Sequence, residues 1–185
     1  MQLTLLAFQG LGRHPKYQAE SGLIQIGHVG LSFIEEELTI YGFHPTAEAV
    51  IQAGGEEGLL ARLRSRIRQP GIIQIDTVHF LRAHELAQHG VANHTTEVVA
   101  LVYDLPDEDC QRMHTQIQDW QQTGREFWYN FPQRGKGLFN PDEYNCATFP
   151  SLLGLNLPTN NGLIRPYVQA MRDAGGIQWQ PPGQP

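Results

Sequence analysis

Cys146 is the residue of this sequence that is best placed to act as a nucleophile. It stands at the start of the apolar segment CATFPSLLGL, directly after a polar loop. A cysteine at a helix N-terminus lies near the positive end of the helix dipole, which lowers the thiol pKa and favours the nucleophilic thiolate. The alternative is a half-buried core thiol, which behaves as a small apolar side chain without a chemical role.

A thiol nucleophile needs a base within hydrogen-bond reach, and the base needs a third polar group that orients it. Among the eight histidines of the chain, His28 has the most suitable surroundings. In the strand-like run GLIQIGHVGLSF, its own face carries Gly30 and Ser32, which are small enough to let a helix end approach. The alternative is a strand histidine satisfied by an ordinary hydrogen bond.

His44 comes to lie beside His28 if the two strand-like runs around EEE form a hairpin. A three-residue loop pairs Gly30 with Gly42 and His28 with His44, whereas a two-residue loop moves His44 to the other side of the sheet. We prefer the first register because it gives the cleaner apolar surface on the opposite face. That surface consists of Val29, Leu31, Phe33, Tyr41 and Phe43.

The remaining segments predict an α+β domain. Strands are expected at LTLLAF, GIIQIDTVHF and TTEVVALVYDL, and helices at residues 56–68, at PDEDCQRMHTQIQDWQQTG and near IRPYVQAMRDAGG. Cys110 falls on one helix face with Met113, Ile117 and Trp120, which predicts a core position. Residues 124–145 are interpreted as a long loop that leads to Cys146. We predict a single domain over residues 1–178 and a disordered tail, rich in Gln and Pro, over 179–185.

The runs GHVGLSF, YGFHP and YNCATF, in this order, resemble the permuted branch of the papain-like amidase superfamily, which includes NlpC-like and lecithin retinol acyltransferase-like cysteine hydrolases. In that branch the histidine strand precedes the cysteine helix. The resemblance implies a permuted papain-like fold, in which a small antiparallel sheet or half-barrel packs against helices. It further implies that Cys146 is the nucleophile, His28 the general base and His44 the orienting residue, with Asp76 and Asn145 as rivals for the third position.

The backbone N–H of Cys146 is a candidate donor to the oxyanion, and Tyr144 or Asn145 is a candidate side-chain donor. Pro150 lies four residues after Cys146, and proline in a helix interior costs about 3 kcal/mol. We therefore expect the helix to start later than Cys146 or to have a distorted first turn. A start near Phe149 would leave more of the thiol activation to His28.

A metal site is the alternative suggested by His79, His84, His89 and His94, which recur every five residues. The helical zinc-protease motif places two histidines four residues apart, so that both imidazoles share a helix face. A separation of five residues turns the second imidazole by about 140° beyond a full turn. The sequence therefore predicts no metal site and no cofactor.

Composition excludes several classes of protein. The net charge of −6 and the pI near 5.7 argue against a general nucleic-acid-binding protein. The arginines of RLRSRIR are interpreted as the solvated face of a helix. No apolar stretch approaches the roughly eighteen residues that span a bilayer, which predicts no stable membrane insertion. The N-terminus lacks the basic region of a classical signal peptide.

These observations predict a cysteine hydrolase that cleaves an amide bond by way of an acyl-enzyme, with a peptide of bacterial peptidoglycan as the expected substrate. Such a protein is expected to be cytoplasmic in its producer, or exported by a specialised secretion system as an antibacterial effector with an inhibitor (immunity) protein as a candidate partner. A lipid acyltransferase, a protein deamidase or peptidase, and a noncatalytic binding module are the alternatives. An activated Cys146 is expected to react with iodoacetamide well below pH 8.

Overall fold

The computed structural model describes residues 1–10, 26–34, 38–89, 97–131, 142–159 and 162–182. The strands are β1 (Gln2–Gln9), β2 (Gly27–Ile34), β3 (Ile40–Pro45), β4 (Gln69–Ile75), β5 (Val99–Tyr103), β6 (Phe127–Tyr129), β7 (Glu143–Tyr144) and β8 (Ile177–Gln178). The helices are α2 (Ala47–Gln52), α3 (Glu56–Arg64), α4 (Thr77–Gln88), α5 (Asp107–Gln122), the 3₁₀-helix η2 (Phe149–Leu153) and α6 (Ile164–Asp173).

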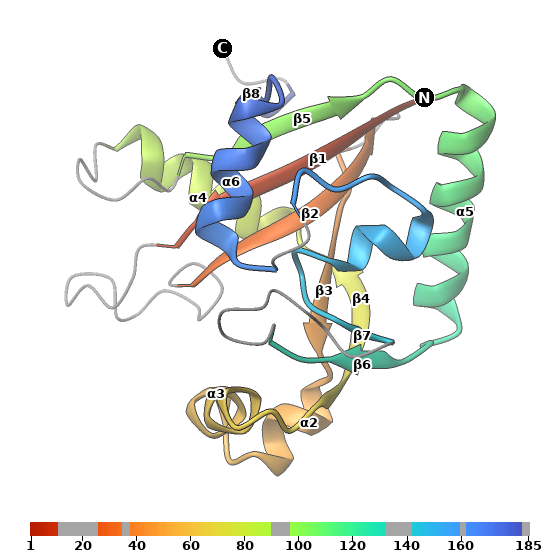
Figure 1. The fold of residues 1–185 in the computed structure, drawn as a ribbon. Helices are drawn as coiled ribbons and strands as arrows, with labels where there is room; N and C mark the ends of the chain where they lie inside the picture. Colours follow the sequence, from red (N-terminus) through yellow and green to blue (C-terminus); the bar gives the residue numbers. More distant parts are fainter. Residues whose placement is uncertain (11–25, 35–37, 90–96, 132–141, 160–161, 183–185) are drawn as a thin grey trace.

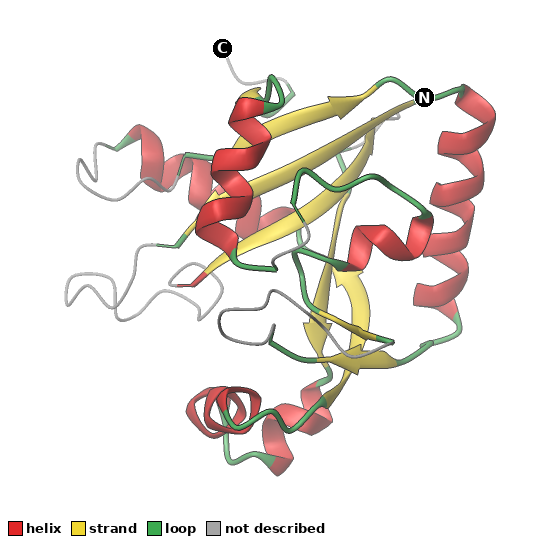
Figure 2. Ribbon diagram, in the orientation of Figure 1, coloured by secondary structure: helices red, strands yellow, loops and turns green. Residues whose placement is uncertain are grey.

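In the described part of the chain, eight strands form one sheet in the order β7-β6-β4-β3-β2-β1-β5-β8. Neighbouring strands are antiparallel except β6 and β7, which run parallel. The sheet curls into a half-barrel that packs against helices, as Figure 2 shows. The predicted α+β architecture is therefore confirmed.

Helices cover the sheet on both faces, and β1 is consequently buried on both sides (Figure 1). Leu3 and Leu5 of β1 belong to the larger core, to which α5 and α6 contribute. Leu6 and Phe8 point to the opposite face and belong to a smaller core with Phe80 of α4. Successive side chains of β1 therefore point in turn into the larger and the smaller apolar core.

The hairpin of β2 and β3 has the preferred register. Gly30 pairs with Gly42, and Leu31 pairs with Tyr41, while the connecting residues 35–37 lie outside the described residues. All five residues of the predicted apolar face are buried in the larger core. On the opposite face the ring centroids of His28 and His44 are 4.7 Å apart.

Gly42 leaves room for the start of α4. A β-carbon at this position would overlap the Asp76 carboxylate and would lie 2.5 Å from His28 Nε2. Asp76 is the N-cap residue of α4, and its backbone N–H donates to the Ile40 carbonyl at 2.7 Å. The helix end that uses this space is therefore that of α4, rather than the segment after Cys146.

Gly42→Ala is expected to lower the free energy of unfolding by about 2–4 kcal/mol, because the added methyl group displaces a buried carboxylate from its partners. Urea denaturation would measure the change. Ser32→Ala is a suitable control on a neighbouring position, since the buried Ser32 hydroxyl has no hydrogen-bond partner and its removal is expected to be nearly neutral. Equal midpoints for the two variants would contradict this account.

Two predicted irregular segments contain ordered structure. Residues 124–145 were predicted to be a loop throughout, but they include β6, which pairs with β4, and β7, while residues 132–141 lie outside the described part. Trp179, which falls in the predicted tail, is buried, and its N–H donates to the Val98 carbonyl at 2.8 Å. The folded part thus extends past residue 178, and residues 183–185 are not described.

Within the described ranges, no helix is both long and apolar enough to cross a bilayer.

Candidate active site

Cys146 lies in a turn between β7 and the 3₁₀-helix η2, which begins three residues later at Phe149. Pro150 stands in the first turn of η2, where a missing backbone N–H costs no helical hydrogen bond. The expected late start of the helix is therefore confirmed. Because η2 is short and begins after the cysteine, its dipole gives the Cys146 thiol little help.

Asn145 holds the turn that carries Cys146. Its Oδ1 accepts from the backbone N–H groups of Ala147 at 2.9 Å and Thr148 at 3.1 Å, and its Nδ2 donates to the Gly162 carbonyl at 2.8 Å. These bonds occupy both ends of the side-chain amide. Asn145 therefore holds the turn that carries the cysteine, and the second N–H of its amide nitrogen keeps it a candidate side-chain oxyanion donor.

The Cys146 sulfur is buried and hydrogen bonded. It interacts with the backbone N–H of Val29, the backbone N–H of Ala147 and the hydroxyl of Tyr129. The pKa of the thiol is raised to about 12, mainly by burial and also by the charge of Asp76, although the hydrogen bonds, chiefly that from the N–H of Val29, act in the opposite direction. The resting group is a neutral thiol, and the sequence-based expectation of a resting thiolate is not supported.

This protonation state predicts slow alkylation. Iodoacetamide is expected to label Cys146 slowly below pH 8, with a rate that rises about tenfold per pH unit, because only the thiolate reacts and its fraction follows the pKa. Labelling of native Cys110→Ala protein, followed by peptide mass spectrometry, isolates the Cys146 thiol. A denatured sample supplies the rate of an uncovered thiol, and equally fast labelling of the native protein at pH 7 would contradict the prediction.

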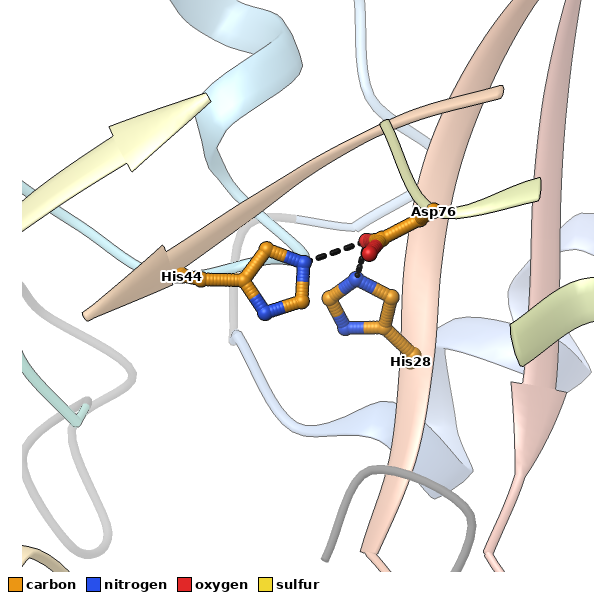
Figure 3. A group of neighbouring side chains, drawn as sticks. All are labelled: His28, His44 and Asp76. Carbon is orange, nitrogen blue, oxygen red and sulfur yellow. Dashed lines mark hydrogen bonds and ion pairs between the residues drawn. The ribbon is translucent and has the colours of Figure 1, made fainter. Parts of the chain in front are cut away.

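His28 is completely buried on β2, and its Nε2 lies 2.7 Å from Asp76 Oδ2 (Figure 3). Burial lowers the pKa of His28 to about 4, although the hydrogen bond with Asp76 acts in the opposite direction. The ring is therefore neutral at pH 7. An ionised carboxylate can only accept, so Nε2 carries the proton and Nδ1 keeps its lone pair. Nδ1 is buried and has no hydrogen-bond partner.

Asp76 joins the two histidines of the hairpin. Its Oδ2 accepts from Nε2 of His28 and also from Nε2 of His44 (Figure 3). Burial alone would raise the pKa of this carboxyl, but the bonds from His28 and His44, with His79 nearby, hold it well below its ordinary range. Asp76, rather than His44, is thus the residue that holds His28 directly.

Cys146 and His28 are brought to the same part of the molecule without being bonded to each other. The sulfur accepts from the N–H of Val29, the residue that follows His28. Neither ring nitrogen of His28 bonds to the sulfur. Nε2 is hydrogen bonded to Asp76, and Nδ1 has no hydrogen-bond partner. The two side chains are therefore near neighbours through Val29, but they do not contact each other through a hydrogen bond.

A groove of about 1030 Å³ opens over this site. The site residues that line it are Cys146, His44, His79, Tyr129 and Asn145. Neither His28 nor Asp76 is a lining residue, and Tyr144, proposed from the sequence as an oxyanion donor, is not one either. Cys146 therefore faces the groove, whereas His28 and Asp76 lie behind its lining residues.

Tyr129 is a site residue that the sequence interpretation missed. It is buried at the end of β6, and its hydroxyl bonds to the Cys146 sulfur. Burial, followed by the nearby sulfur, raises the pKa of Tyr129 well above its ordinary value, so that the hydroxyl keeps its proton. The aromatic run FWY has a high strand propensity and could have placed this residue in the sheet.

His28, His44 and Asp76 each offer one ligand atom, and these atoms lie within 4.8 Å of one another. The cluster has the composition of a cation site, but both Nε2 atoms are engaged with the carboxylate. Of the other described histidines, His79 lies at the edge of the cluster, with its Nδ1 3.3 Å from Asp76 Oδ1, whereas His84 packs against Trp179 and His89 is exposed near Glu85. His94 lies outside the described residues.

Comparison of the chain with protein-family models, curated proteins and solved structures finds no match. The resemblance to the permuted papain-like amidases therefore stays a prediction.

Proposed function

We propose that this protein is a cysteine hydrolase that cleaves an amide bond, with Cys146 as nucleophile and His28 as general base. The observation that supports this most strongly is the buried His28 ring, whose Nε2 is fixed by Asp76 and whose Nδ1 is unpartnered next to the strand position that bonds the Cys146 sulfur. A nucleophile, a base and an orienting carboxylate are the parts that acyl transfer requires.

Because both groups rest in the neutral form, the first step is general-base catalysis. Rotation of the Cys146 side chain brings the sulfur to Nδ1 of His28, which takes the thiol proton as the bond from sulfur to the carbonyl carbon forms. Asp76 stabilises the imidazolium through Nε2. His44 donates to the same carboxylate oxygen and helps to keep Asp76 ionised.

Collapse of the tetrahedral intermediate transfers the proton from His28 to the leaving nitrogen, breaks the C–N bond and leaves a thioester on Cys146. Water, deprotonated by His28, then releases the acid. When the sulfur turns toward His28, the Tyr129 hydroxyl loses its resting partner and becomes a donor for the oxyanion, together with the backbone N–H of Cys146.

A peptidoglycan peptide remains our first substrate prediction, since it follows from the sequence resemblance, and export as an effector with an inhibitor partner remains a prediction with it. A second candidate, an acyl group of lipid character, is favoured by the largely apolar wall of the groove. Both candidates use the same nucleophile and base, because fold and chemistry do not determine the substrate.

The proposal is tested with purified peptidoglycan, its free stem peptides and a series of N-acyl amides, incubated with wild type, Cys146→Ala and His28→Ala proteins. Mass spectrometry of released fragments is expected to show products with wild type alone. Acid quenching during turnover is expected to leave the acyl mass on the Cys146 peptide. The same products from all three proteins would refute the assignment.

A further inference from the structure

The groove over Cys146 has an extended apolar wall that the proposed chemistry does not itself need. Val50 of α2 and Leu59, Leu60 and Leu63 of α3 form one side, and Leu163 and Ile164 at the start of α6 form another. The volume of about 1030 Å³ lies at the upper end of small-molecule sites. An apolar chain bound here would remove aliphatic surface from water on both partners.

Three arginines line the same groove: Arg64 and Arg66 at the end of α3, and Arg165 in α6. Glu56 is the only carboxylate among the described lining residues, so the groove is locally cationic in a chain of net charge −6. None of the three guanidinium groups forms an ion pair with a carboxylate of the described residues. Unpaired guanidinium groups suit carboxylates, which they can bind through two parallel hydrogen bonds.

Arg66 has an unusual backbone conformation for a residue with a side chain. Its φ is +68°, in the left-handed region, at the C-terminal end of α3, where glycine is the preferred residue because it has no β-carbon. Its guanidinium donates to the Phe131 carbonyl at 3.3 Å across the groove region. The Arg66 guanidinium is thereby held beside the groove at the cost of a backbone conformation that glycine would adopt more easily.

We infer that the groove binds an N-acylated amino acid, with its aliphatic acyl chain against Leu59, Leu60 and Leu63 and its free carboxylate at the arginines. The inference rests on the proposed function, because the amide between these two parts is the bond that Cys146 cleaves. The sulfur bonds to the acyl carbonyl carbon, the C–N bond breaks, the thiol proton goes to the nitrogen and the amino acid leaves. Water then hydrolyses the thioester to the fatty acid and the free thiol.

Binding is tested without turnover on Cys146→Ala protein by calorimetry with N-dodecanoylglycine and its neutral amide. The acid is expected to bind about tenfold more tightly at low ionic strength, with a difference that shrinks as salt is added. Arg66→Gly is expected to remove most of this preference and at the same time to raise the melting temperature. Arg112→Ala is the charge-matched control, since Arg112 pairs with Asp109 on α5 and does not line the groove.

The apolar wall is tested with wild type protein and N-acylglycines from acetyl to dodecanoyl. The value of kcat/KM is expected to rise by at least about a hundredfold along the series, because each buried methylene adds transfer free energy. Leu60→Gln is expected to flatten this dependence. Ile51→Gln is the control, since Ile51 lies on α2, is 76% exposed and does not line the groove.

Equal affinity for the acid and the neutral amide, or affinity that does not depend on chain length, would overturn the inference even if the protein cleaved peptidoglycan peptides. Tighter binding of an acyl phosphate ester than of the acyl amino acid would overturn the choice of ligand. Charge- and length-dependent binding to Cys146→Ala protein, without hydrolysis by wild type, would support the ligand and refute the proposed function.

Discussion

Cys146→Ala is expected to lower the rate of amide hydrolysis by at least about 10⁴-fold, because the covalent route disappears with the sulfur. The hydrogen bonds of Asn145 that hold the turn do not involve the cysteine side chain, so the variant is expected to fold normally. Initial rates and the unfolding midpoint of the same preparation would separate lost chemistry from lost structure.

Cys110→Ala is the matched control for this substitution. Cys110 is the other cysteine of the chain, and its fully buried side chain packs in the larger core from α5. The substitution leaves a small cavity and is expected to cost about 1 kcal/mol of stability, with hydrolysis unchanged. Substantial hydrolysis by Cys146→Ala, or its complete loss in folded Cys110→Ala, would each contradict the assignment of Cys146 as nucleophile.

Asp76→Asn is expected to lower kcat by about 10³-fold to 10⁴-fold with little change in KM, because Asp76 does not line the groove and acts through His28. The neutral amide removes the charge that stabilises the imidazolium. The amide can also turn so that its N–H groups face His28 Nε2. Nε2 would then have to accept a hydrogen bond, which places the ring proton on Nδ1, where the proposed mechanism needs a lone pair.

The isosteric control is Asp119→Asn, which makes the same change of charge at an exposed position of α5. Its kinetic constants are expected to equal those of wild type. A kcat for Asp76→Asn within tenfold of wild type would mean that the carboxylate is not needed to orient or stabilise the base. An increase in KM alone would instead indicate a role in substrate binding.

The positions of the two histidines could be predicted because one of the two possible hairpin registers gives the cleaner apolar face, and this register is the one observed. A slip by one residue would separate Tyr41 and Phe43 from the face that carries Val29, Leu31 and Phe33, so the hydrophobic pattern favours the observed pairing. The position of His44 relative to His28 followed from that pattern. The late start of the helix after Cys146 could also be predicted, because the constraint imposed by Pro150 is local.

The link between the histidines could not be predicted in this way. Asp76 reaches them because α4 begins where Gly42 leaves space, and that contact depends on packing between segments distant in sequence. The same limit applies to Tyr129, which meets Cys146 only through the pairing of β6 with β4 and β7. The neutral thiol was missed because burial, which dominates its pKa, is a property of the folded chain.

The covered, protonated sulfur of Cys146 has a consequence for how the protein withstands oxidants. Peroxide attacks thiolates, so a sulfur that stays protonated under a tyrosine hydroxyl is oxidised to the sulfenic acid slowly. Covalent inhibitors face the same barrier, and strong electrophiles without shape complementarity to the groove gain little. If the proposed mechanism holds, compounds that first occupy the groove and turn the sulfur toward His28 are expected to form an adduct fastest.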